Sequence, residues 1–191
     1  MRGRAQQLPW AGGLATYGRT LTSARRGAQP ERDAPAMELL KLAALDAEDL
    51  AVISAHLQDA VLRAGDLAYL ATSHRFVLVA RRFDWSAAEG EAPRRRLTGI
   101  HFERVLAART RGIAPGSNTD AVLNLLAITF EPSEAPSGTA TLVFAGGAAI
   151  QLDLECIEVR LKDLGPVWEA EGRPDHAAAQ AGRAVIEGRE A

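Results

Sequence analysis

The sequence predicts an α+β fold in which an antiparallel meander forms a curved sheet or an open roll. Short runs of alternating apolar and polar residues follow one another from about residue 65 to residue 155, separated by loops rich in Gly, Pro, Asn and Ser. On either side of these runs, apolar residues recur at three- and four-residue steps, which is typical of a helix that packs on one face. Consecutive strands with short turns form antiparallel sheets, and their apolar face must be covered. We therefore expect an N-terminal helix and a C-terminal helix that caps the sheet.

The N-terminal helix is expected to follow a short strand or extended lead-in over residues 38–45. Asp46 is placed to cap the helix. Glu48 and Asp49 fall in its first turn, where the helix dipole favours negative charge. The expected buried stripe is Leu50, Ile53, Leu57 and, if the helix reaches that far, Val61.

Four strands are predicted after this helix. They cover residues 65–70, 76–83, 96–110 and 122–131. The third strand turns Ile100 and Phe102 inward and loses its alternation near Arg104–Val105, which indicates a bulge. The residues expected on the buried face of the fourth strand are Leu126, Ile128 and Phe130.

The register of the last predicted hairpin follows from its side chains. A two-residue loop on the Gly-Gly pair would place apolar Leu142 opposite polar Gln151. A three-residue loop, Ala145–Gly147, places Leu142 opposite Ile150 instead. Because register decides which face is buried, we predict the three-residue loop, with a glycine in the left-handed conformation.

The C-terminal capping helix is predicted over residues 155–164 and is ended by Gly165 and Pro166. Its apolar stripe is Ile157, Leu161 and Leu164. A meander closed in this way is similar to a pleckstrin-homology-like roll, an analogy of fold that carries no function.

The patterned part of the chain is expected to form a single domain over residues 37–168. Residues 1–36 have neither helical nor strand periodicity and are expected to be a disordered extension. Because Met37 directly precedes the first patterned segment, we expect it to be the true start; a targeting segment and a functional tail are the alternatives for residues 1–36. Residues 169–191 are expected to be a polar flexible tail.

Composition argues against several kinds of partner. The chain has a net charge of -2, and residues 1–36 are basic, so the remainder is acidic. That charge argues against a nucleic-acid partner, since nonspecific affinity comes mostly from neutralised phosphates. The longest nearly apolar run, residues 121–130, is too short to span a bilayer. The single Cys156 rules out an internal disulfide and is consistent with a cytoplasmic protein.

Four segments carry a resemblance to a known family. They are residues 40–70, 75–85, 99–105 and 142–165. Together they resemble an uncharacterised family of alphaproteobacterial proteins, a domain of unknown function, over about residues 38–168. The resemblance implies a cytoplasmic bacterial protein without an assigned activity, and it transfers no catalytic residue.

No catalytic or cofactor motif stands out. The sequence has no nucleophile elbow, no phosphate-binding P-loop and no dinucleotide-binding glycine motif that opens a helix. Cys156 is flanked by Glu155 and Glu158, which oppose thiolate formation, so we interpret it as a packing residue. The histidines do not have the spacing of metal ligands: they are His56, His74, His101 and His176. We therefore expect no catalytic residue, no metal and no cofactor.

The strongest functional signal is a group of arginines around one predicted hairpin. The candidate residues are Arg81, Arg82, Trp85, Arg94, Arg95, Arg96 and Arg104. Arginine binds carboxylate or phosphate through two parallel hydrogen bonds, and Trp85 can stack on a guanidinium or a ligand ring. Asp84, Glu89 and Glu91 lie in the same loop and can neutralise the arginines locally, which favours a structural role.

We expect a non-catalytic binding module that recognises an acidic protein or peptide, or another anionic partner, through this hairpin. The alternative is an enzyme or small-metabolite-binding protein with a pocket between the sheet and the C-terminal helix. A third possibility, an RNA-associated protein, would need Arg94–Arg96 and Arg104 to form one stripe with exposed aromatic residues. The oligomeric state does not follow from the sequence.

Overall fold

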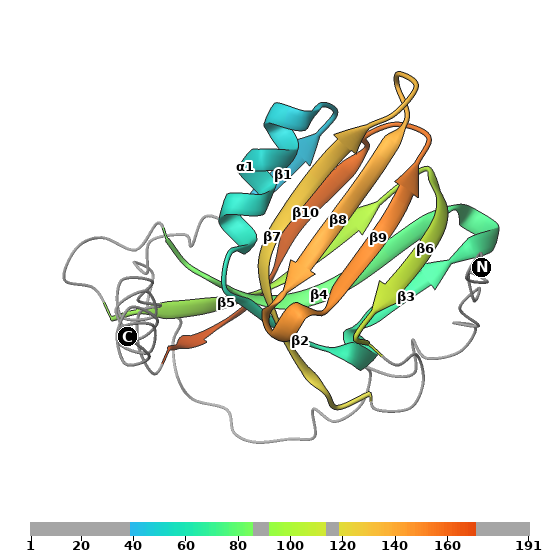
Figure 1. The fold of residues 1–191 in the computed structure, drawn as a ribbon. Helices are drawn as coiled ribbons and strands as arrows, with labels where there is room; N and C mark the ends of the chain where they lie inside the picture. Colours follow the sequence, from blue (N-terminus) through green and yellow to red (C-terminus); the bar gives the residue numbers. More distant parts are fainter. Residues whose placement is uncertain (1–38, 86–91, 114–118, 171–191) are drawn as a thin grey trace, which may run out of the picture.

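A computed structural model describes residues 39–85, 92–113 and 119–170 (Figure 1). Their strands and one α-helix are, in chain order, β1 (Lys41–Ala44), α1 (Ala47–Leu57), β2 (Ala60–Arg63), β3 (Leu67–Leu70), β4 (Arg75–Phe83), β5 (Arg94–Phe102), β6 (Val105–Arg111), β7 (Val122–Pro132), β8 (Gly138–Phe144), β9 (Ala149–Leu154) and β10 (Val159–Glu169). Short 3-10 turns lie at Ala64–Asp66, Ala71–Ser73 and Ala145–Gly147.

The strands form one strongly curved antiparallel sheet in the order β1-β10-β5-β4-β2-β7-β8-β9-β6, with β3 paired to β4. Strand β2 joins the two halves of this sheet, since it pairs with β4 on one side and with β7 on the other. Figure 1 shows β7, β8, β9 and β6 in front of β4, β5 and β10, and the ends of β5 and β10 reach beyond the front layer. The result is an open roll with an extension at one end.

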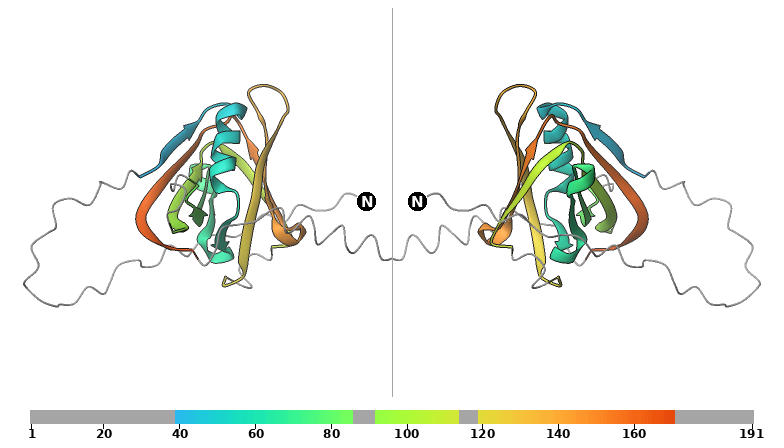
Figure 2. Two further views of the ribbon diagram at one scale, coloured as in Figure 1. Left: turned by 90° about the vertical axis from the view of Figure 1, so that its left-hand side faces the viewer. Right: turned by 90° about the vertical axis from the view of Figure 1, so that its right-hand side faces the viewer.

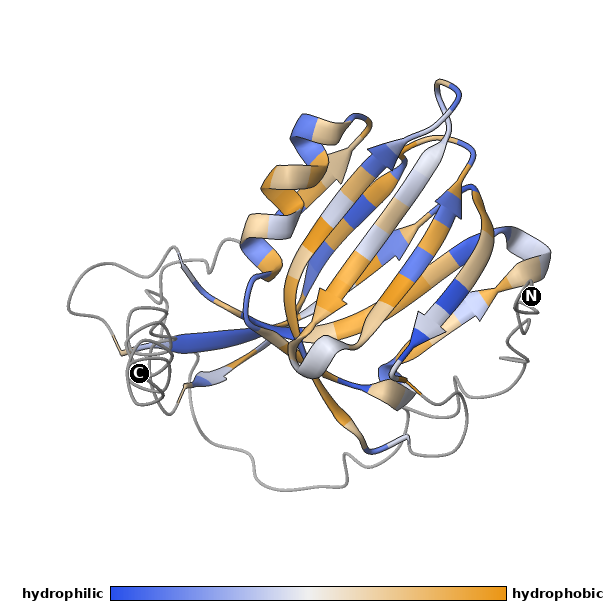
Figure 3. Ribbon diagram, viewed as in Figure 1, coloured by the Kyte–Doolittle hydropathy of each residue, from blue (hydrophilic) through white to orange (hydrophobic). Residues whose placement is uncertain are grey.

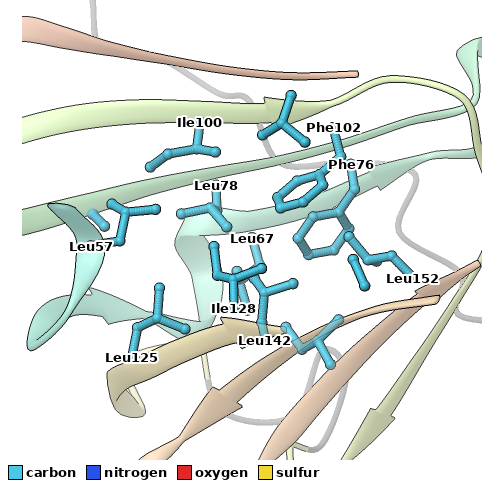
Figure 4. Close-up of a cluster of buried hydrophobic side chains, with 14 of the residues drawn as sticks. Leu57, Leu67, Phe76, Leu78, Ile100, Phe102, Leu125, Ile128, Leu142 and Leu152 are labelled. Atoms are coloured by element: carbon cyan, nitrogen blue, oxygen red, sulfur yellow. The ribbon is translucent and has the colours of Figure 1, made fainter. Parts of the chain in front are cut away.

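Apolar side chains fill the space between the two halves. Along the strands, hydrophobic and hydrophilic residues alternate (Figure 3), which places one side of each strand in the core. In Figure 4, Phe76 and Phe102 meet near Leu152 of the opposite half. Their ring centroids lie 6.4 Å apart in an edge-to-face arrangement, a favourable geometry for two aromatic rings.

The N-terminal helix agrees with its prediction. The Asp46 side chain accepts a hydrogen bond from the Asp49 backbone N–H at 2.8 Å, and Glu48 and Asp49 lie in the first turn. Leu50, Ile53 and Leu57 are buried. Figure 2 shows α1 between the β1/β10 side of the roll and the β7 side, so this helix covers the open side of the core.

The C-terminal capping helix was a wrong prediction. Residues 159–169 form strand β10, which pairs with β1 on one side and β5 on the other. The described chain is therefore a sheet-dominated fold with one α-helix rather than an α+β fold. Val159 and Leu161 point into the core with period two, while Leu164 is 48% exposed, so the predicted helical stripe does not form.

Three local predictions also need correction. Val61 lies in β2, a strand the sequence did not indicate, and not at the end of the helix. The predicted third strand is two strands, β5 and β6, divided by a turn at Glu103–Arg104, in which Arg104 has a φ of 58°. The predicted bulge near Arg104–Val105 has a counterpart, since the register of β6 against β9 shifts between Val105 and Ala107. A second shift, in β7 between Leu125 and Ala127, buries Leu125 and leaves the predicted core residue Leu126 41% exposed.

The β8–β9 hairpin confirms the predicted register. Leu142 lies opposite Ile150, and Ala140 lies opposite Leu152. The connection passes through Ala145–Gly147, where Gly146 has a φ of 75°. Glycine is favoured there because a left-handed backbone strains other residues.

Candidate binding site

The hairpin of β4 and β5 divides the predicted site residues between two faces of the sheet. Arg82 lies directly opposite Arg96, and Phe83 lies opposite Arg95. Since neighbouring residues of a strand point to opposite faces, Arg82 and Arg96 continue the inner row of Phe76, Leu78 and Ala80. Figure 3 shows the end of β5 as strongly hydrophilic where it extends beyond the front layer.

The inner face holds a buried ion pair that spans β4 and β10. The Nε and Nη2 atoms of Arg82 donate to the two carboxylate oxygens of Asp163, at 2.9 and 2.7 Å. The Thr98 hydroxyl and the Leu40 backbone N–H also donate to this carboxylate, at 2.7 and 3.0 Å. Arg82 is 2% exposed and Asp163 is 1% exposed, so the pair lies outside the reach of solvent.

A second buried pair lies beside the first. Arg96 Nε donates to Asp84 Oδ2 at 2.6 Å, and Arg82 Nη1 lies 4.0 Å from Asp84 Oδ1. We call Arg82, Asp84, Arg96, Thr98 and Asp163 the buried ion cluster. The Nη1 atom of Arg96 is buried without a hydrogen bond in the described part of the chain. The four charged side chains of the buried ion cluster carry two positive and two negative charges, so the charges of the cluster balance.

Electrostatics within the cluster follow from this geometry. Burial by itself would raise the pKa of Asp163, but the hydrogen bonds from Arg82, Thr98 and Leu40 outweigh it and lower that pKa below its ordinary value. His56, in the last turn of α1, is close enough to respond to the cluster. Its pKa is lowered, first by burial and then by the charge of Arg82.

The outer face of the same hairpin carries aromatic residues together with arginine. The Phe83 and Trp85 rings lie with their centroids 4.6 Å apart, and the Arg95 guanidinium carbon lies 5.9 Å from the Phe83 centroid. Trp168 of β10 is the cross-strand neighbour of Arg95. Arg81 shares this face because it lies two residues before Phe83. We call Arg81, Phe83, Trp85, Arg95 and Trp168 the outer aromatic face. Phe83 is only 1% exposed, so it supports its neighbours from beneath.

The two arginines of the outer aromatic face differ in their bonding. Arg95 Nη1 donates to the carbonyl oxygens of Asp59 and Arg81, at 2.9 and 3.0 Å. Burial lowers the pKa of Arg95, and the nearby Asp59 opposes that effect. Arg81 is a half-buried residue, and its guanidinium forms no hydrogen bond or ion pair with another described residue. Within residues 39–85, 92–113 and 119–170, the donors of the Arg81 guanidinium are therefore not used.

The two remaining predicted site residues, Arg94 and Arg104, lie apart from the outer aromatic face. Arg94 lies opposite Glu169 on β10, on the inner side of the sheet. Arg104 lies at the other end of β5, where its guanidinium is 3.7 Å from Glu155 and 4.0 Å from Glu158. The predicted group is thus not one patch, and Arg94–Arg96 with Arg104 do not form one stripe.

Sequence reasoning missed the acidic partner on β10. Local neutralisation by Asp84 is present as an ion pair with Arg96, whereas Glu89 and Glu91 lie outside the described residues. The partner of Arg82 is Asp163, 81 residues further along the chain. The sequence pattern that could have revealed this partner is the alternation of Val159, Leu161 and Asp163, all three of which point inward.

Metal-ligand clusters and membrane-spanning helices do not occur among the described residues. In the described ranges, no three His, Cys, Asp or Glu side chains are grouped so that they could hold a metal ion. Cys156 is a free, half-buried cysteine. In the same ranges, no helix is both long and apolar enough to cross a membrane.

Comparison with known proteins gives a family but no activity. The model of one family matches residues 40–176, and its description reads "Protein of unknown function (DUF2948)". The chain belongs to this family, which confirms the resemblance to a domain of unknown function. No curated protein and no solved structure matches the chain.

Proposed function

We propose that this protein is a non-catalytic binding module that holds an acidic protein segment against its outer aromatic face. The observation that carries the proposal concerns the half-buried residue Arg81. Its guanidinium has no partner among the described residues and lies on the same face as Arg95 and Trp85. Carboxylates of a partner would accept two hydrogen bonds from such a guanidinium.

The two tryptophans of this face would supply contact area beside the charge. Trp85 is 36% exposed, and Trp168 is half-buried. Aromatic residues and arginine are enriched where protein interfaces have their strongest contacts. An acidic segment with an apolar side chain next to its carboxylates would therefore fit the chemistry of the outer aromatic face.

The buried ion cluster supports the proposal in a different way. Its arginines are occupied by Asp84 and Asp163, so they are assigned to holding β4, β5 and β10 together and not to contact with the partner. A bidentate pair in a dry site fixes the positions of both strands. The outer aromatic face is thereby presented on a rigid support, which lowers the entropic cost of binding.

The alternative hypothesis, an enzyme or metabolite-binding protein, predicted a pocket at a place that the structure does not contain. That pocket was predicted between the sheet and a C-terminal helix, and residues 159–169 are a strand.

The test is a titration of the full chain with a glutamate-rich peptide that contains one phenylalanine, followed by tryptophan fluorescence. We expect saturable binding that weakens with salt, and about a tenfold loss of affinity in Arg81→Gln, since a charge-assisted hydrogen bond is worth about 1.5–3 kcal/mol. Arg160→Gln is the matched control because Arg160 is an exposed arginine of the same sheet half. Equal affinity in the parent, Arg81→Gln and Arg160→Gln would contradict the proposal.

A further inference from the structure

A hollow of about 110 Å³ lies on the other half of the sheet, away from the outer aromatic face. Three strands line it with six residues: Arg109, Thr110, Arg111, Thr141, Ala149 and Gln151. Cross-strand pairing explains how they meet. Thr141 lies opposite Gln151, and Gln151 lies opposite Arg109. One polar row therefore crosses β8, β9 and β6.

Ala149 makes room for the hollow between longer side chains. It lies opposite Arg111 on β6 and opposite Val143 on β8. Ala149 is 5% exposed, so its methyl group lies beneath its neighbours. A larger residue at this position would fill the space that Arg111 and Gln151 border.

The hydrogen-bond donors around the hollow are only partly used. Arg109 is held by Asp153 through two bonds, from Nη1 at 2.6 Å and from Nη2 at 2.5 Å. Arg111 donates from Nε to the Gly147 carbonyl oxygen at 3.3 Å. Its Nη1 and Nη2 groups form no hydrogen bond with another described residue. The Thr141 hydroxyl and the Gln151 carboxamide form no hydrogen bond with another described residue.

The charge at the hollow is positive. Arg109 and Arg111 contribute two positive charges, and Asp153 neutralises one of them. Because the Asp153 carboxylate also accepts from Thr139 at 3.3 Å, it is directed to Arg109 and Thr139. In the described part of the chain, the guanidinium of Arg111 then has no carboxylate partner and lies beside two neutral donors.

We propose that this hollow binds a phosphate group. The three donors come from three different strands: Arg111 from β6, Thr141 from β8 and Gln151 from β9. A tetrahedral oxyanion offers oxygens in several directions to such donors, whereas a carboxylate offers two oxygens in one plane. This site is independent of the acidic segment proposed for the outer aromatic face, since it lies on the other half of the sheet.

The experiment is an NMR titration of the ¹⁵N-labelled full chain with inorganic phosphate, and with acetate in parallel. We expect phosphate to shift the resonances of Arg111, Gln151 and Thr141 in a saturable way, with acetate causing little change. Arg111→Gln should weaken phosphate binding about tenfold. Thr141→Val should weaken it several-fold, since it removes a hydroxyl at constant shape.

Matched controls come from the same molecule. Thr129 lies opposite Thr141 on β7, outside the lining of the hollow, so Thr129→Val should leave phosphate binding unchanged. Ala149→Val should weaken binding because it fills the space and removes no donor. Three results would each overturn the proposal: equal shifts with acetate, affinity unchanged in both Arg111→Gln and Thr141→Val, or no shift at about 10 mM phosphate, well above a millimolar dissociation constant.

Discussion

At the scale of single residues, the contact between Arg82 and Asp163 is the most sensitive point of the fold. Both side chains are nearly inaccessible, and both oxygens of the carboxylate face the guanidinium. Removal of one partner leaves the other charge buried without compensation. We expect Arg82→Met to lower the free energy of unfolding by about 3–5 kcal/mol, measured by urea denaturation.

A triple variant separates charge from packing at the same position. Arg82→Met with Asp163→Leu and Thr98→Val replaces the ion pair and the hydroxyl that donates to it by apolar groups. Such replacements are often neutral or stabilising. We therefore expect the triple variant to regain most of the stability that Arg82→Met loses. A triple variant as unstable as the single one would show that the charges themselves hold β4, β5 and β10 together.

His56 predicts a pH dependence of stability in the range where histidine titrates. Burial and the charge of Arg82 lower its pKa in the folded chain below the ordinary histidine value of 6.5. The unfolded chain then binds the proton more readily. The contribution of His56 to stability is therefore complete above about pH 6.5, falls as the pH drops from there toward the folded pKa, and levels off below that pKa. Thermal unfolding between pH 7.5 and about pH 5 should show this loss.

His56→Gln should flatten that part of the profile. A loss at more acidic pH should remain in the variant, because the lowered pKa of Asp163 makes its contribution disappear as that carboxylate becomes protonated. If the parent and His56→Gln have parallel profiles from pH 7.5 to about pH 5, another group is responsible for the dependence.

At the scale of elements, β10 shows why its segment resembles a helix in the sequence. Ile157, Leu161 and Leu164 are spaced four and three residues apart, as on one face of a helix. Val159, Leu161 and Asp163 fit period two equally well. Strands β1 and β5 decide between the two patterns, since β10 pairs with both of them. Neither pairing is visible within the segment itself.

The predictable features of the chain are the local ones. The Asp46 cap and the β8–β9 register depend on residues within about a dozen positions, and both were found from the sequence. The partner of Arg82 and the division between β5 and β6 depend on distant strands. For the candidate site, the sequence indicated the arginine-rich hairpin but could not show which arginines face the core, because the alternation there carries charged residues on both faces.

Two leucines of β10 distinguish the strand from the predicted helix. A helix would bury both Leu161 and Leu164, whereas the strand leaves Leu161 inaccessible and Leu164 48% exposed. We expect Leu161→Ala to reduce the free energy of unfolding by about 2–5 kcal/mol, and Leu164→Ala to stay within about 1 kcal/mol of the parent, as for surface substitutions. Similar losses at both positions in urea denaturation would contradict the strand.

At the scale of the whole molecule, α1 connects the two halves of the roll. Strand β2 pairs with β7 only from Val122 to Leu125, and α1 takes its place beside the next residues of β7. The Ser54 hydroxyl accepts a hydrogen bond from the Ile128 backbone N–H at 2.8 Å. The helix thus satisfies a donor on a strand edge that would otherwise be exposed to pairing. Two residues further along the helix, His56 lies near the buried ion cluster.

Ser54→Ala tests this connection because it removes an acceptor and leaves the helix propensity favourable. The Ile128 N–H would lose its partner, and we expect the variant to be about 1–3 kcal/mol less stable, with faster hydrogen exchange at the Ile128 amide. Val52→Ala is the matched control on the same helix, since Val52 is 51% exposed and should change little. If exchange at Ile128 is unaffected by Ser54→Ala, the helix shields this strand edge through packing alone. Faster exchange at Ile128, with the amides of β4 and β5 unchanged, would show that α1 can loosen from β7 while the β4–β5 hairpin stays folded.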